Sequence, residues 1–243
     1  KRKIIGAMVY PIVVIMVAVA ILSFILIYII PKFKKIFADF QMKLPAITEL
    51  LLDISDFFKD NWFVFPLVLI GLWLFIKLVC LFKKGRYAWD WIKLHIPIVG
   101  GIIEKTIIAR TTRTLGTLVS SGVPILEALS IVKETCNNAV FEYMYQRVYE
   151  SIREGETIAA PLKESRLVDD MVVNMVDVGE ETGELDKMLY KVADTYDDEV
   201  KTLTDGLMAL IEPLLIVFLG GAVGFIVIAL FIPLISLITN LSK

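Results

Sequence analysis

The sequence contains, at residues 12–30, the run IVVIMVAVAILSFILIYII, which has nineteen residues and no charge. At a rise of about 1.5 Å per residue, a helix of this length spans roughly 28 Å, close to the thickness of the hydrocarbon core of a membrane. The run is too long for the apolar region of a signal peptide, and no small-residue cleavage site follows it. It therefore predicts a transmembrane helix, within a first segment that covers residues 1–31.

Two further apolar stretches predict two more transmembrane helices. Residues 62–82 are interrupted only by Lys77, and residues 213–242 comprise thirty uncharged residues. We expect Lys77 to extend its ammonium group to the membrane interface, and a functional intramembrane charge is the alternative. Together the three stretches explain why 57% of the 243 residues are hydrophobic and only 21% are charged, whereas soluble domains are about 45–50% apolar.

The composition excludes several classes of protein. A net charge of −2 and high hydrophobicity exclude disorder. The single histidine, His95, excludes a multi-histidine metal site, and Cys80 and Cys136 are too few for a disulfide scaffold. No phosphate-binding loop and no nucleophile–base set occurs in the sequence, so we expect no catalytic residues and no enzyme activity.

The loop at residues 32–61 predicts an amphipathic helix. Acidic residues separate apolar residues that recur at helical spacing. The apolar residues are Ile47, Leu50, Leu51, Ile54, Phe57 and Phe58. We expect this helix outside the cytoplasm, either on the membrane face or packed on a partner.

Residues 83–206 predict one helical domain, because the apolar pattern is helical throughout and hairpin signals are missing. Short connections favour antiparallel neighbours. The fold class is therefore an all-α membrane protein with three transmembrane helices and an antiparallel bundle of about six helices. These helices are expected near residues 102–120, 124–135, 139–154, 157–165, 168–180 and 184–206. The last one runs on towards the third span, residues 207–243, without a strong break before Pro213.

Charge is distributed unevenly over this domain. Residues 83–113 hold seven basic and two acidic residues, whereas residues 177–212 hold eleven acidic and three basic ones. The basic end adjoins a membrane span, where anionic lipid headgroups lie. The acidic end is either a solvated face or a docking surface for a basic partner.

Residues 178–186 (VGEETGELD) predict a junction between two helices. Thr182 can cap the second helix, and Glu184 favours its positive end. Capping does not explain why Glu180 and Glu181 precede the turn, where a helix C-terminus disfavours acids. A carboxylate cluster could bind Ca²⁺, although the spacing is not that of an EF-hand.

The third span begins at Glu212-Pro213. Pro213 removes one helical hydrogen bond and can kink the helix at this point. Further along, Gly220 and Gly224 form a GxxxG pattern, which permits close approach of another helix.

Five segments, taken together, resemble the type II secretion system F family, the inner-membrane platform proteins of type II secretion and type IV pilus machines. Their order and spacing match the C-terminal half of that family and cover nearly the whole chain. The segments are residues 44–48, 110–118, 121–124, 178–185 and 212–213.

The resemblance implies a scaffold that couples a cytoplasmic ATPase to the assembly of pilin or pseudopilin subunits in the bacterial inner membrane. It places the 83–206 domain in the cytoplasm. The implied partners are that ATPase, pilin transmembrane helices, other inner-membrane assembly proteins, the lipid bilayer and further copies of the chain, with no nucleic acid. Some family members bind Ca²⁺. The candidate partner-binding residues are Arg110, Arg113, Gly122, Glu180, Glu181, Gly183, Glu184, Glu212 and Pro213.

Family members usually carry two copies of the helical domain, and this sequence has one. We expect that an N-terminal copy lies outside this sequence or that the protein is a shorter member. The alternative function is a transporter or ion-pathway subunit. It would need polar groups at midplane depth, and the spans offer only Lys77, Glu212 at an edge, and small hydroxyl residues.

Overall fold

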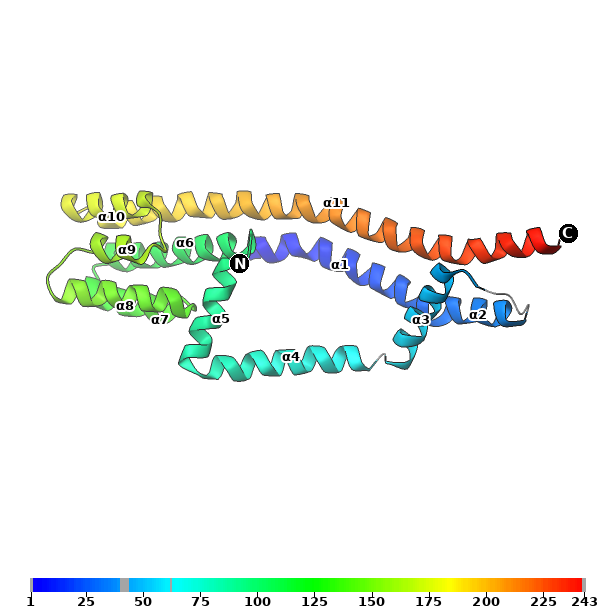
Figure 1. The fold of residues 1–243 in the computed structure, drawn as a ribbon. Coiled ribbons are helices and arrows are strands. Elements are labelled where there is room, and N and C mark those ends of the chain that lie inside the picture. Colours follow the sequence, from blue (N-terminus) through cyan, green and yellow to red (C-terminus); the bar gives the residue numbers. More distant parts are fainter. Residues whose placement is uncertain (1, 40–43, 62, 242–243) are drawn as a thin grey trace. The chain divides into compact units, whose positions relative to one another are not determined.

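A computed structural model of the chain describes residues 2–39, 44–61 and 63–241, and all regular structure in these ranges is helical (Figure 1). This confirms the all-α prediction. The elements are α1 (Arg2–Phe24), the π-helix η1 (Ile25–Ile29), α2 (Ile30–Asp39), α3 (Ala46–Asp60), α4 (Val64–Leu81), α5 (Lys83–His95), α6 (Val99–Ser120), α7 (Ile125–Thr135), α8 (Ala139–Arg153), α9 (Ala159–Ser165), α10 (Asp170–Thr182) and α11 (Leu185–Leu241).

Within the described residues, two helical stretches, Val9–Phe37 and Leu185–Ile235, are long and apolar enough to cross a membrane. A third span results if Pro66–Leu81 is counted together with Lys83–His95, which is bent from it by 119°. As predicted, the last bundle helix continues into the third apolar stretch, because α11 runs through Pro213 without ending. Trp62 and Ser242, at the ends of two predicted spans, lie outside the described residues.

The chain forms two compact units. One consists of Lys1–Leu74 together with Leu207–Lys243, and the other of Phe75–Gly206. The domain boundaries expected from the sequence, and the side of the membrane assigned to each domain, stay predictions.

In the first unit, α3 is the amphipathic helix expected in the loop. Its buried residues are Thr48, Leu51, Leu52 and Ser55, which share one face at a spacing of three, four and seven positions. Leu51 and Leu52 join a core with Ile30 and Phe37 of α2 and with Ile226, Ala229 and Leu230 of α11.

The face of α3 that is buried within the chain does not coincide with its whole apolar face. Leu50 and Phe57 belong to the apolar face that the sequence predicts, and they are 53% and 55% exposed. The hydroxyl residues Thr48 and Ser55 are instead 0% and 1% exposed. The reason is that both hydroxyls donate hydrogen bonds to backbone carbonyls of neighbouring helices.

In the second unit, α5 to α10 and the first part of α11 surround one apolar core. Its largest fully buried side chains include Ile108 of α6, Leu129 of α7, Phe141 and Met144 of α8, and Leu189 and Tyr196 of α11. One buried polar pair crosses this core, where the Tyr145 hydroxyl donates to Thr111 Oγ1 at 2.6 Å. Burial raises the pKa of the Tyr145 hydroxyl, which keeps that group a neutral donor.

The count of about six bundle helices is not confirmed, because α5 is an additional helix that the sequence pattern did not indicate. Only Asp90 of its residues is buried. Tyr87, Trp91 and Ile92 of α5 are exposed, so the helix lacks the core-facing apolar stripe on which such predictions depend.

Candidate functional site

The junction between α10 and α11 brings together four of the candidate residues. Gly183 follows the last residue of α10 with a φ of 73°, a left-handed conformation that glycine adopts without steric cost. Thr182 does not cap α11 as predicted, because it is the last residue of α10 and its hydroxyl donates to the Val178 carbonyl at 2.7 Å.

Glu180 has a structural role that the sequence did not indicate. Its Oε2 accepts the backbone N–H of Ile158 at 2.9 Å. Ile158 immediately precedes α9, so this carboxylate ties the start of α9 to the end of α10. The acidic residue is placed at the helix C-terminus because it serves another segment.

Glu181 and Glu184 point to solvent instead. Both residues are exposed, and the Glu184 carboxylate pairs with Lys187 at 2.5 Å. The Glu184 carbonyl accepts the Met188 N–H at the start of α11. Among the four candidate residues at this junction, Glu181 and Glu184 therefore keep carboxylates that a partner protein can contact.

The carboxylates at this junction do not form a ready cation site. Across residues 2–39, 44–61 and 63–241, no three His, Cys, Asp or Glu side chains lie close enough to hold a metal ion. The Glu180 carboxylate already accepts from Ile158. These residues do not fit Ca²⁺ in their present arrangement, and Ca²⁺ binding stays a prediction.

Two candidates in α6 join it to other helices of the bundle, and a third, Gly122, closes its C-terminus. Arg110 donates to the backbone carbonyl of Cys136 at the end of α7. Arg113 bridges Asp194 and Asp197 of α11 at 2.8 and 2.7 Å. Gly122 follows α6 with a φ of 79° and closes its end through backbone bonds, so its presence is explained by the turn.

The acidic part of α10 and α11 presents carboxylates to solvent. Asp194 and Asp197 have side chains that are 70% and 60% exposed even though both contact Arg113. We define the acidic strip as the exposed residues Glu181, Glu184, Asp194, Asp197 and Asp198. Such a strip can attract a basic protein surface.

Glu212 and Pro213 lie in the other unit, where Glu212 lines a groove between α1 and α11. The groove has a volume of about 290 Å³ and is otherwise mainly apolar. Its lining residues are Tyr10, Pro11, Val14, Met208, Ala209, Ile211, Glu212, Leu215, Ile216 and Leu219. Because Pro213 has no N–H, the Ala209 carbonyl four residues earlier lacks its usual helical donor.

The GxxxG segment of α11 is not used for packing among the described residues. A Cβ atom added at Gly220, Gly221 or Gly224 would meet nothing within 4 Å. This face of α11 is therefore open to another helix or to lipid.

Comparison with known proteins decides the family. Residues 111–233 match the family described as type II secretion system (T2SS), protein F. The match runs from α6 into the apolar half of α11 and includes every candidate residue except Arg110.

The chain belongs to the type II secretion system protein F family. It is 41% identical to the type IV pilus assembly protein PilC of Myxococcus xanthus, with 98% of this chain and 57% of the relative aligned. It is also 41% identical to PilC of Thermus thermophilus, with 100% of this chain and 60% of the relative aligned. It is 33% identical to the type II secretion system protein F of Aeromonas hydrophila, with 98% and 61% aligned. The chain thus spans about three fifths of the length of these F-family relatives.

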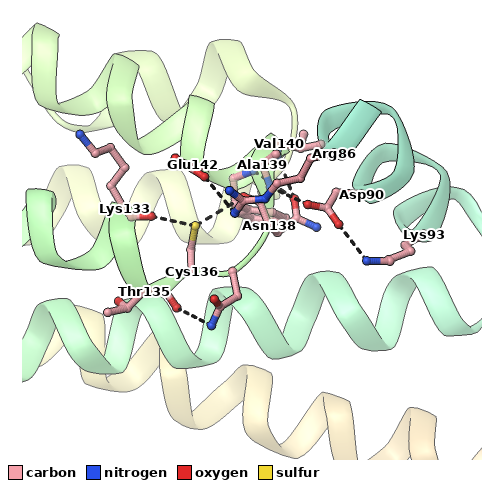
Figure 2. A network of polar contacts seen from close by, with 12 residues as sticks. Arg86, Asp90, Lys93, Lys133, Thr135, Cys136, Asn138, Ala139, Val140 and Glu142 are labelled. Carbon is pink, nitrogen blue, oxygen red and sulfur yellow. Dashed lines mark hydrogen bonds and ion pairs between the residues drawn. The ribbon is translucent and has the colours of Figure 1, made fainter. Parts of the chain in front are cut away.

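Three contacts of this F-family chain were missed from the sequence. Asp90, which is 5% exposed, accepts the N–H of Ala139 and so joins α5 to α8 (Figure 2). Thr48 and Ser55 join α3 to its neighbours. A signal for the contacts of Thr48 and Ser55 existed, since two hydroxyl residues seven positions apart share one helix face.

Proposed function

We propose that this chain is an inner-membrane platform protein that couples a cytoplasmic assembly ATPase to the assembly of pilin or pseudopilin subunits. The observation that carries the proposal is the family match across α6 to α11, in a chain with helices apolar enough to cross a membrane. The relatives are named for type IV pilus assembly and for type II secretion. These names disfavour the transporter alternative.

In this proposal the protein is a scaffold and not an enzyme, and the Phe75–Gly206 unit faces the cytoplasm of a bacterial cell. The acidic strip is the docking surface for a basic face of the ATPase. Exposed carboxylates speed association with a basic surface and set orientation, and their effect weakens with salt.

The groove beside Glu212 is the proposed contact for a subunit helix within the membrane. Its apolar walls suit an apolar helix, and Glu212 together with the Ala209 carbonyl can accept hydrogen bonds there. The open glycine face of α11 offers a second close-approach surface.

The acidic strip is tested by recruitment of the ATPase to membranes that carry the full-length protein. The variant Glu181→Gln/Glu184→Gln/Asp198→Asn removes three negative charges from exposed positions, and recruitment should fall while the melting temperature is unchanged. The matched control is Glu127→Gln/Glu134→Gln/Glu154→Gln, which removes three exposed charges elsewhere in the same unit.

If the two variants recruit the ATPase equally well, the acidic strip is not its docking surface. Crosslinking in membranes tests the platform itself. Recovery of a secretion or pilus ATPase supports it, whereas self-contacts alone together with solute flux in liposomes would overturn it.

A further inference from the structure

The helix α5 carries basic and aromatic side chains on its exposed surface. Lys83, Lys84 and Arg86 are exposed, and so are Tyr87 at 41% and Trp91 at 47%. Within the part of the chain that the structure describes, Lys83 and Lys84 form no ion pair. A helix of this composition is typical of the interface between a membrane and water.

The position of α5 follows from the helix before it. The apolar helix α4 ends at Leu81, α5 begins at Lys83, and the two are bent by 119°. If α4 crosses a membrane, a bend of this size turns α5 so that it runs roughly along the membrane surface. Leu81 and Phe82 at the bend are 76% and 74% exposed, as residues that enter lipid would be.

α5 is attached to the bundle by Asp90 and Leu94, which lie on the same face of the helix as Lys83 and Tyr87. Asp90 accepts the Ala139 N–H through Oδ2 at 2.9 Å and Lys93 through Oδ1 at 2.9 Å (Figure 2). Leu94 packs against the bundle core. Lys83, Arg86 and Tyr87, on this face, are therefore held beside the bundle.

A groove lies between α5 and α8. It has a volume of about 370 Å³ and is lined by three cationic side chains and one carboxylate. Arg86 contacts that carboxylate, Glu142, at 3.2 Å (Figure 2). The lining residues are Lys83, Arg86, Tyr87, Lys133, Ala139, Glu142, Tyr143 and Gln146.

We propose that α5 and this groove bind the phosphate headgroup of an anionic phospholipid of the membrane that α4 crosses. Lys83 and Arg86 contact the phosphate from the rim of the groove, and Lys84 contacts neighbouring headgroups. Tyr87 and Trp91 enter the interface beside them. Two observations select this occupant: the positive charge of the groove and its continuity with the end of an apolar helix.

The site is tested on the full chain, purified in detergent and examined by native mass spectrometry with phosphatidylglycerol and with phosphatidylcholine. The wild type should retain phosphatidylglycerol preferentially. In Lys83→Gln/Lys84→Gln/Arg86→Gln the preference should fall by at least about tenfold, because each basic residue near an anionic surface contributes severalfold. The matched control Lys163→Gln/Lys191→Gln/Lys201→Gln removes the same charge from exposed positions elsewhere in the unit and should keep the preference.

Equal retention of the two lipids by the wild type, or equal losses in both variants, would overturn the proposal. Displacement of the lipid by inorganic phosphate would assign the groove to a soluble phosphate and would also overturn it. A measurement on the folded wild type guards against a variant that misfolds. Tryptophan emission is compared between the wild type and Trp91→Phe in vesicles that contain brominated phosphatidylglycerol. The difference between the two spectra is the emission of Trp91, which the bromine atoms should quench. Unquenched Trp91 emission would contradict its contact with lipid.

Discussion

The Thr48 hydroxyl of α3 donates to the Ala229 carbonyl of α11 at 2.6 Å, and the residue four positions beyond Ala229 is Pro233. Proline has no N–H, so the Ala229 carbonyl lacks its usual helical donor, and Thr48 supplies one. Residue 48 thus needs a hydroxyl group because a proline in another helix leaves a carbonyl without its donor.

Ser55, seven positions along the same face of α3, has an equivalent role. Its hydroxyl donates to the Leu26 carbonyl in the π-helix η1. In this π-helix the Ile30 N–H donates to the Ile25 carbonyl, five residues earlier. By the same pattern the Leu26 carbonyl would accept from residue 31, but that residue is Pro31 and has no N–H. One short helix thus supplies donors to two backbone positions where prolines remove them, which matters most where water is scarce.

Replacing Thr48 by valine should destabilise the first unit by about 1–3 kcal/mol, because it leaves a buried carbonyl without its donor while conserving shape. Thermal unfolding of the purified protein measures the effect. Thr48→Ser retains a hydroxyl and should lose less. Thr202→Val, which removes a hydroxyl from an exposed position, should change the free energy of unfolding by less than about 0.5 kcal/mol.

Pro233→Ala should reduce the cost of Thr48→Val, because the new N–H at residue 233 can donate to the Ala229 carbonyl. A double-mutant cycle measures this coupling, for which contacting groups typically give about 0.5–3 kcal/mol. Additive effects of the two substitutions would contradict the link between Thr48 and Pro233.

Glu180→Ala should destabilise the second unit by about 1–2 kcal/mol, because the N–H of buried Ile158 loses its charged acceptor. Glu181→Ala, one residue along and exposed, should cost less than about 0.5 kcal/mol. Chemical denaturation of both variants checks the difference. Equal losses would argue against the role of Glu180 in holding the start of α9.

Glu104→Gln should stabilise the protein at pH 7. Burial raises the pKa of Glu104 above its ordinary value of 4.5, against the opposing effect of Lys105. The folded state therefore binds this proton more tightly than the unfolded state, and the associated stability is lost as the pH rises through the folded-state pKa. The gain of the variant in melting temperature should shrink as the pH falls towards about 4.5. The exposed Glu127→Gln is the control, and a gain that does not depend on pH would contradict the explanation.

Much of the fold could be predicted because its signals are local. The lengths of the apolar runs, the helical spacing and the glycines at Gly122 and Gly183 act within a few residues of sequence. The helix α5 was not predicted, because most of its aromatic and basic residues are exposed and its single buried residue, Asp90, is charged. The candidate site residues likewise fall into those whose exposure fits the prediction and those whose contacts the sequence did not indicate. Glu181 and Glu184 are exposed as a docking surface requires, whereas Glu180 and Arg110 are engaged with backbone groups far away in sequence.

The sequence by itself determined that the chain is helical, that it contains apolar helices of membrane-spanning length, and that it carries the segments of its family. Only the tertiary structure decided which face of α3 is buried and what Glu180 does. The physical reason is that hydrophobic periodicity reports the average environment of a face, whereas a hydrogen bond is made to one specific atom. The Ala229 carbonyl and the Ile158 N–H lie 181 and 22 residues from their partners, and only folding brings them within reach.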